Sequence, residues 1–164
     1  RRYRVGSAYF ESAAMSYLIG VEGFKKDLRK LGSGVRNGLL LQAVEAGGLV
    51  VEGAAKVNVN NQGLVDSGNL ENSIHVEAKE TDSGAECLVG TNVEYAPIHE
   101  FGGEIKPVHA QYLHFTVDGE EVFTKLVVMP ARPYLRPALD ENHDAIESAV
   151  STTLRDGIER LAGK

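Results

Sequence analysis

Apolar residues recur at helical spacing near both ends of the chain and at strand spacing between them. Near the start, helical spacing extends over 18–31 and, after the break Gly32-Ser33-Gly34, over 35–57. Near the end it runs from Leu135 to Leu161, with Pro137 in the first turn, where a missing N–H costs nothing. Because the helical patterns flank the strand patterns instead of alternating with them, the order predicts an α+β fold.

The middle of the chain predicts antiparallel strands. Alternation over 74–79 and 85–89 predicts one pair joined by a turn at 81–84, and alternation over 112–117 and 121–129 predicts a second pair joined by Asp118-Gly119. We expect a small antiparallel sheet of about four strands. Two long amphipathic helices, an N-terminal helical segment and a C-terminal helix complete the expected fold, and 102–110 is expected to be a long exposed loop.

Length and composition indicate one globular domain. The 164 residues are 43% apolar and 24% charged, an ordinary globular balance. We expect 15–164 to form a single domain. Residues 1–14, which open with Arg1-Arg2-Tyr3-Arg4, are interpreted as a non-native segment or a flexible arm.

Several classes of protein are disfavoured by composition. Charged residues interrupt each apolar stretch before it reaches the ~20 residues that cross a bilayer, so no membrane association is expected. The single cysteine, Cys87, excludes an internal disulfide. A net charge of −6 opposes sequence-independent binding of nucleic acid. We also expect the protein to be synthesised in the cytoplasm.

Candidate catalytic groups are sparse. His99, His109 and His114 cluster in sequence, but they lack the i, i+4 spacing of a zinc protease and are interpreted as solvated or hydrogen-bonded side chains. Cys87 occupies an inward strand position, where cysteine behaves as a small hydrophobe. There is neither a nucleophile elbow nor a glycine-rich phosphate loop. We therefore assign no catalytic, cofactor-binding or metal-binding residue and expect no enzyme activity and no cofactor.

Three local clusters serve backbone geometry. The first is V-D-S-G-N-L-E-N-S-I at 65–74, where Asp66 or Ser67 can cap a short helical turn. The second, Y-A-P-I-H-E-F-G-G at 95–103, ends in flexible glycines. The third, M-P-A-R-P-Y-L-R-P-A-L at 129–139, has three prolines that hold the chain extended and then begin the last helix.

In this order and at these separations, the three clusters resemble the neck or tail-completion family of long-tailed phages, the gene-product-ten-like phage morphogenesis proteins. The resemblance extends over about 21–161. Two departures leave the tail type open: the proline that usually begins the first motif is absent, and the extra hairpin before Pro130 is similar to tail-completion relatives from contractile-tailed phages. The motif residues are Asp66, Ser67, Gly68, Leu70, Ser73, Ile74, Tyr95, Glu100, Phe101, Gly102, Pro130, Ala131, Arg132, Pro133, Leu135 and Pro137.

The resemblance implies a structural virion protein without catalytic residues. It implies a homo-oligomeric ring, hexameric or dodecameric, located at the neck or upper end of the tail after assembly in the host cytoplasm. The implied partners are the head connector and the tail terminator or tail tube protein, and DNA passes through without specific binding. A negative charge suits such a channel, because an acidic lumen does not hold phosphates.

Two further hypotheses concern single residues. Arg132, between two prolines, is a candidate for a bidentate pair with Glu100 or Asp66 that would hold the final helix to the β layer. The loop carrying Lys106, His109 and Tyr112 is a candidate interaction loop that becomes ordered on docking. The alternatives to a virion protein are a cytoplasmic bacterial protein-binding module and, on the histidines alone, a small metal-dependent hydrolase.

Overall fold

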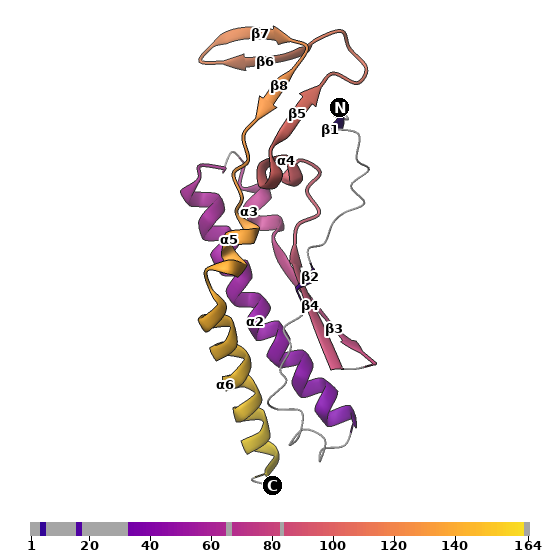
Figure 1. The fold of residues 1–164 in the computed structure, drawn as a ribbon, viewed down its shortest axis with the longest axis vertical. Helices are drawn as coiled ribbons and strands as arrows, with labels where there is room; N and C mark the ends of the chain where they lie inside the picture. Colours follow the sequence, from indigo (N-terminus) through magenta and orange to yellow (C-terminus); the bar gives the residue numbers. More distant parts are fainter. Residues whose placement is uncertain (1–3, 6–15, 18–32, 65–66, 83, 163–164) are drawn as a thin grey trace. The chain divides into compact units, whose positions relative to one another are not determined.

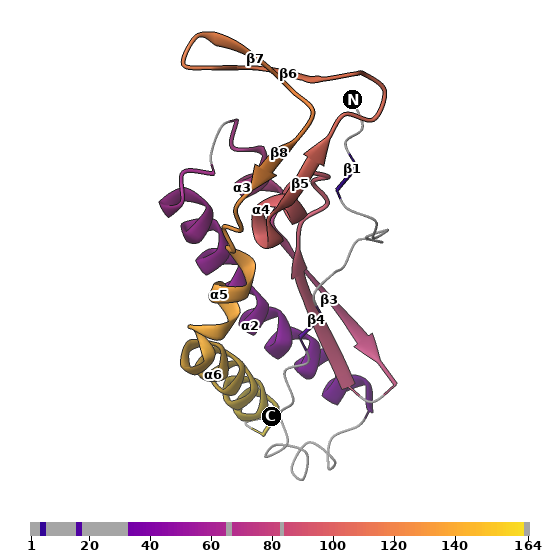
Figure 2. The ribbon, with the colours of Figure 1, turned by 45° about the horizontal axis from the view of Figure 1, so that its top comes forward.

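The computed structural model describes residues 4–5, 16–17, 33–64, 67–82 and 84–162, with side chains from Gly38 onward. Helices and strands are mixed, so the expected α+β class is confirmed (Figures 1 and 2). The helical segment expected at 18–31 lies outside the described residues. In chain order the elements are β1 (Arg4–Val5), β2 (Ser16–Tyr17), α2 (Ser33–Asn61), α3 (Asn69–Ser73), β3 (His75–Thr81), β4 (Gly84–Gly90), α4 (Ala96–Phe101), β5 (Gly103–Lys106), β6 (Leu113–Val117), β7 (Glu120–Thr124), β8 (Val127–Met129), α5 (Leu135–Asp140) and α6 (His143–Ala162).

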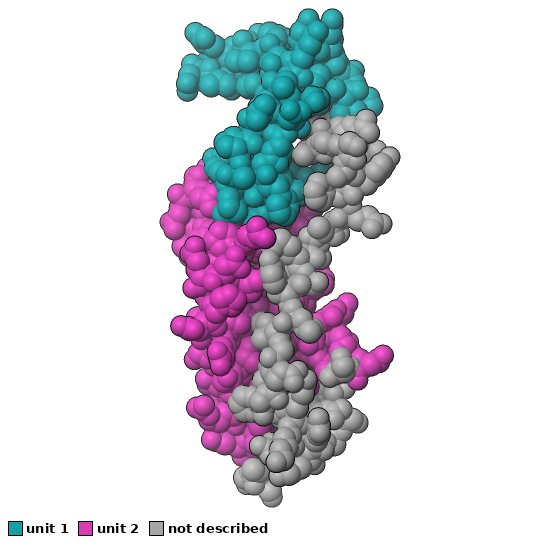
Figure 3. All heavy atoms as spheres, in the orientation of Figure 1, with its two compact units in different colours: residues 1–13, 94–133 teal, residues 14–93, 134–164 magenta. Residues whose placement is uncertain are grey.

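The chain divides into two compact units, coloured separately in Figure 3. Unit 1 comprises 1–13 and 94–133, and unit 2 comprises 14–93 and 134–164. Each is described by itself. The expectation of one domain over 15–164 stays a prediction.

Unit 2 is built around α2. This helix lies between α6 on one side and the β3–β4 hairpin on the other (Figure 1), and it also contacts α3 and α5. Strand β4 pairs with both β3 and β2, always antiparallel. The buried apolar side chains come from all these layers: Leu39, Ala43, Val44, Val51, Ala55, Val59, Leu70, Ile74, Cys87, Tyr134, Ala138, Leu139, Ile146, Val150 and Leu154.

Two glycines allow the close packing of α2. A Cβ on Gly48 would overlap the Sγ of Cys87, and a Cβ on Gly157 of α6 would overlap Cδ1 of Leu39. A larger residue at either position would force the Cys87 sulfur, or the end of the Leu39 side chain, to move. These contacts explain why α2 and α6 keep glycines that weaken isolated helices.

The buried positions of α2 do not follow a single helical stripe of the kind expected over 35–57. Val57 is exposed, whereas Ala55 and Val59 are buried. The cause is that α2 is covered from two directions, by α6 and by the hairpin, so two adjoining stripes are buried instead of one. Among the described residues, helix Gly38–Asn61 is long and apolar enough to cross a bilayer despite its charged residues, although a helix in the core of a soluble protein meets the same criterion.

Unit 1 contains two small antiparallel sheets. One has the strand order β1-β5-β8, and the other is the β6–β7 hairpin, which projects away from β5 and β8 within this unit (Figures 1 and 2). The strands of the described chain are thus shared among three sheets instead of forming one. Strand β1 lies in the segment 1–14 interpreted as an arm, and it pairs with β5 through Arg4 and Val5.

Two elements of unit 1 differ from the sequence expectation. The loop expected over 102–110 begins with a strand, β5, because residues 103–105 pair with distant residues 127–129 of β8. The strand expected over 121–129 is broken, because the Thr124 hydroxyl donates to the Leu126 carbonyl at 2.9 Å and accepts from its N–H at 3.3 Å. This local turn separates β7 from β8.

The final helix, expected to be continuous, is also broken. Helix α5 ends at Asp140 and α6 begins at His143. The Asn142 side chain donates to the Ala138 carbonyl at 2.9 Å, and the Asn142 carbonyl accepts from the N–H of Ile146 at 2.9 Å. Asparagine at this position therefore closes one helix and begins the next.

Candidate functional site

The first motif forms a tight corner in unit 2. Leu70 and Ile74 are among the most deeply buried side chains of the chain. Helix α3 begins after Gly68, which has a φ of 74°, and no side chain caps it. The expected cap by Ser67 is therefore wrong, because a left-handed glycine occupies the cap position, and Asp66 lies outside the described residues.

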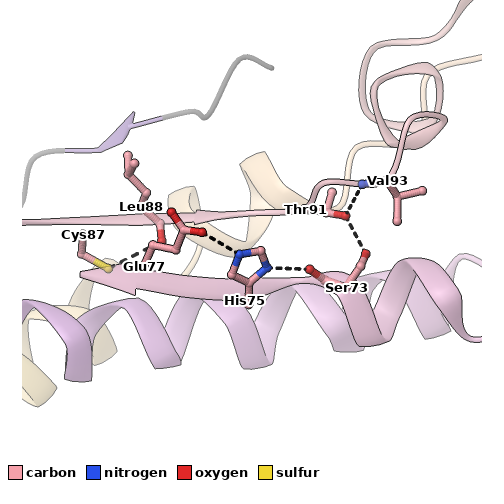
Figure 4. Close-up of polar contacts among 7 residues, drawn as sticks. All are labelled: Ser73, His75, Glu77, Cys87, Leu88, Thr91 and Val93. Atoms are coloured by element: carbon pink, nitrogen blue, oxygen red, sulfur yellow. Dashed lines mark hydrogen bonds and ion pairs between the residues drawn. The ribbon is translucent and has the colours of Figure 1, made fainter. Parts of the chain in front are cut away.

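Ser73 and Thr91 form a hydrogen-bonded chain behind this corner (Figure 4). The Ser73 hydroxyl donates to the Leu70 carbonyl at 2.7 Å and lies 2.6 Å from the Thr91 hydroxyl, which accepts from the N–H of Val93 at 3.1 Å. Because the Ser73 hydroxyl donates its only hydrogen to the Leu70 carbonyl, the Thr91 hydroxyl must be the donor in the hydrogen bond with Ser73. The sequence pointed to Ser73 but not to Thr91, which follows β4 and is distant in sequence.

His75 makes a further hydrogen bond to Ser73 (Figure 4). Its Nδ1 lies 2.8 Å from the Ser73 carbonyl, and its Nε2 lies 3.0 Å from Oε1 of Glu77. Only the protonated ring donates from both nitrogens. The backbone hydrogen bond, followed by the Glu77 carboxylate, accordingly raises the pKa of His75 above its ordinary value.

The second motif forms α4 of unit 1. Ala96, Ile98 and Glu100 are buried, with Glu100 only 6% exposed, whereas Tyr95 and Phe101 lie on the outside. The rings of Tyr95 and His99 meet edge to face with centroids 5.9 Å apart. The short helix thus leaves an aromatic ring exposed at each of its two ends.

Gly102 connects the second motif to the third. Its φ is 67°, and a Cβ there would lie 2.7 Å from the Ala131 nitrogen and 2.8 Å from the Met129 carbonyl oxygen. Next to this contact the Arg132 N–H donates to the His99 carbonyl at 2.7 Å. The structure therefore joins residues 95–102 to residues 129–132 through backbone atoms, which any larger residue at 102 would separate.

The charge of Arg132 also acts on the side chain of His99. Nδ1 of His99 and Nε of Arg132 are buried and have no hydrogen-bond partner in the described part of the chain. Burial, and then the Arg132 charge, lower the pKa of His99 below its ordinary value. The bidentate pair of Arg132 with Glu100 or Asp66 stays a prediction.

The remainder of the third motif belongs to unit 2. Tyr134 is 2% exposed, and its carbonyl accepts a hydrogen bond of 2.9 Å from the Asn58 side chain on α2. Leu135 and Pro137 form the first turn of α5, which packs on α2. The boundary between the units thus falls inside the third motif, between Pro133 and Tyr134. Pro130, Ala131 and Pro133 stay in unit 1, and the sequence did not indicate Asn58.

Two residues of the candidate interaction loop make local contacts. Lys106 belongs to β5, and its Nζ lies 2.7 Å from Oε2 of Glu104. The Lys125 Nζ stands 5.4 Å from the ring centre of Tyr112, a cation–π distance. His109 is exposed. Its role in docking stays a prediction.

The candidate reactive groups are dispersed. The described residues contain no group of three or more His, Cys, Asp or Glu placed to hold a metal ion. His114 stacks on Phe123 with ring centroids 4.4 Å apart, whereas His99 belongs to α4. Burial and the Glu45 carboxylate raise the pKa of the Cys87 thiol to about 11, so the thiolate is not the prevailing form at neutral pH.

Residues of all three motifs make packing or backbone contacts in the structure. The model of the phage virion morphogenesis family matches residues 49–155. The chain belongs to that family and has a structural role in the assembly of phage virions. Neither the curated proteins nor the solved structures compared with the chain give a match.

Proposed function

We propose that this chain is a ring-forming neck subunit that completes the tail and joins it to the head. Membership of a virion morphogenesis family supports the general role. The observation that supports the finer role is the number of large apolar side chains left exposed between residues 108 and 128, because exposed apolar surface beyond the ordinary marks contacts with other proteins. Its partners would be copies of itself, a head connector and a tail terminator or tail tube protein.

The test is a phage that lacks this gene, examined by electron microscopy. We expect filled heads and finished tails that fail to join, with joining restored when the parent chain is supplied from a plasmid. Infectious, properly tailed particles in the absence of the gene would refute the proposal. Absence of both heads and tails would place the protein earlier in assembly.

Charge supports passage of DNA through such a ring without specific binding. The chain carries 23 acidic against 17 basic residues. Carboxylates along the lumen would keep phosphates from binding to the wall. A density map of the assembled ring tests this expectation, and a lumen lined mainly by Lys and Arg would contradict it.

A further inference from the structure

The outer edges of the sheets in the described part of the chain are protected in different ways. An edge strand presents a row of backbone N–H and C=O groups that pair readily with a strand of another molecule. Strand β3, at one edge of the β2-β4-β3 sheet, carries the exposed charged residues Glu77, Lys79 and Glu80. Strand β8, at one edge of the β1-β5-β8 sheet, has three residues and is followed by Pro130. Charge, short length and proline each oppose pairing with a second molecule.

Strand β4 lacks these protections. It has seven residues and no proline. Its one charged residue, Glu86, forms an ion pair of 2.6 Å with Lys79 of β3. All its residues are buried or half-buried, and Cys87 lies against Gly48 of α2. A long strand with so little free charge is the kind that pairs edge to edge with another chain, so β4 needs protection from elsewhere in the molecule.

Strand β2 occupies the edge of β4 that faces away from β3 (Figure 1). Ser16 lies opposite Leu88, and Tyr17 lies opposite Cys87, in the antiparallel direction. Cys87 is the middle residue of β4, so β2 covers the centre of this edge although it has only two residues. A strand of another molecule laid along the whole of β4 would have to displace β2.

We propose that β2 is an autoinhibitory strand, which occupies a strand-addition site on β4 and so keeps β4 from pairing with β4 of a second copy. Strand β4 has antiparallel neighbours on both sides, so the β4 of another copy, running antiparallel, fits the ladder that β2 completes. A second copy is the partner because this pairing uses the same edge on both molecules and needs no other surface. The inference goes beyond the proposed function and does not depend on it.

Two double variants of the full chain test whether β2 protects β4. Neighbouring residues of a strand direct their N–H groups to opposite sides, so one of Ser16 and Tyr17 directs its N–H toward β4. Ser16→Pro with Tyr17→Pro removes that donor, whereas Ser16→Val with Tyr17→Val keeps it in residues that favour strands. Hydrogen exchange of the β4 amides that face β2 should quicken with the prolines and keep the parent rate with the valines. The amides of α2 should stay protected in both variants.

Sedimentation measures the consequence for self-association. The proline variant should associate about tenfold or more tightly than the parent chain, and the valine variant should differ from the parent by less than about threefold. Leu88→Lys in the proline variant should return association to the parent level, because lysines from two paired copies of β4 repel each other. Val128→Lys supplies the same charge at a 65% exposed position of β8, and it should not reverse the association.

Four results would overturn the inference. They are unchanged exchange in β4 of the proline variant, association no tighter than that of the parent, equal reversal by Leu88→Lys and Val128→Lys, and loss of protection throughout α2. The last result would show that β2 is required for folding of unit 2 instead of guarding an edge. The outcome of the head–tail joining experiment bears only on the proposed function, so the two can fail separately.

Discussion

Gly48 of α2 lies directly against Cys87 of β4, so closely that a Cβ on Gly48 would overlap the cysteine sulfur. The same Cβ would lie 3.0 Å from Cγ1 of Val76 on β3. The helix therefore meets the hairpin at a point where neither layer has room for another carbon atom. This contact limits the size of the side chain that position 48 can accept.

Gly48→Ala should destabilise the chain by about 1–3 kcal/mol, the usual cost of overpacking. The clash outweighs the ~1 kcal/mol that alanine gains over glycine in a helix. Gly53→Ala on the same helix is the matched control, because its Cβ meets open space, and it should stabilise the chain by up to ~1 kcal/mol. Urea unfolding measures both, and similar effects from the two substitutions would show that the crossing is looser than described.

Gly102→Ala should destabilise unit 1 selectively. The left-handed backbone and the contact with backbone atoms of Ala131 and Met129 together cost about 3 kcal/mol or more. Hydrogen exchange should quicken in β5 and β8, whereas amides of α2 keep their protection. Gly119→Ala, also at positive φ but in open space, supplies the control for backbone strain alone. Unchanged exchange in β5 would contradict this role of Gly102.

Ser73→Ala and Thr91→Val should each cost about 1–2 kcal/mol, because each leaves a hydrogen-bonding group without its partner. Their effects should be non-additive, since both remove the 2.6 Å contact between the hydroxyls. Chemical unfolding of the two single variants and the double variant measures the coupling. Ser148→Ala, on the exposed face of α6, controls for the general effect of losing a hydroxyl. Strict additivity would mean that the two hydroxyls do not interact.

Cys87 should make stability decline in alkali. Its pKa is about 11 in the folded chain against an ordinary value of 9.0. The raised pKa contributes stability that is complete below pH 9.0 and is lost as the pH rises toward 11. The free energy of unfolding of the parent should therefore fall more steeply over this range than that of Cys87→Ala. Rapid reaction of native Cys87 with a thiol reagent at pH 7 would argue against its burial.

His99 should destabilise the folded chain in mild acid. Burial and the Arg132 charge lower its pKa below 6.5, so stability is retained above pH 6.5 and is lost as the pH falls toward the folded value. NMR titration of Arg132→Gln should show a higher pKa for His99 than in the parent, and Arg132→Lys should keep the lower one. A pKa that does not respond to Arg132→Gln would leave burial as the whole cause.

Part of the candidate site was visible in the sequence. The second motif and the beginning of the third were singled out separately, and the structure joins them through Gly102, Ala131 and the Arg132–His99 hydrogen bond. Thr91 and Asn58 were missed, because each acquires its role from a residue far along the chain. The assignment of the motif residues to assembly stays a prediction.

The sequence by itself determined the elements whose causes are local. Three features depend only on neighbouring residues: the helical period of apolar residues over 143–162, the Asp118-Gly119 turn, and the strand alternation around 75–90. The helix and the two hairpins that they predict are present. Only the tertiary structure decided which stripes of α2 are buried, where the last helix breaks and that β5 pairs with β8. Those outcomes depend on contacts between segments distant in sequence, where packing outweighs local preference.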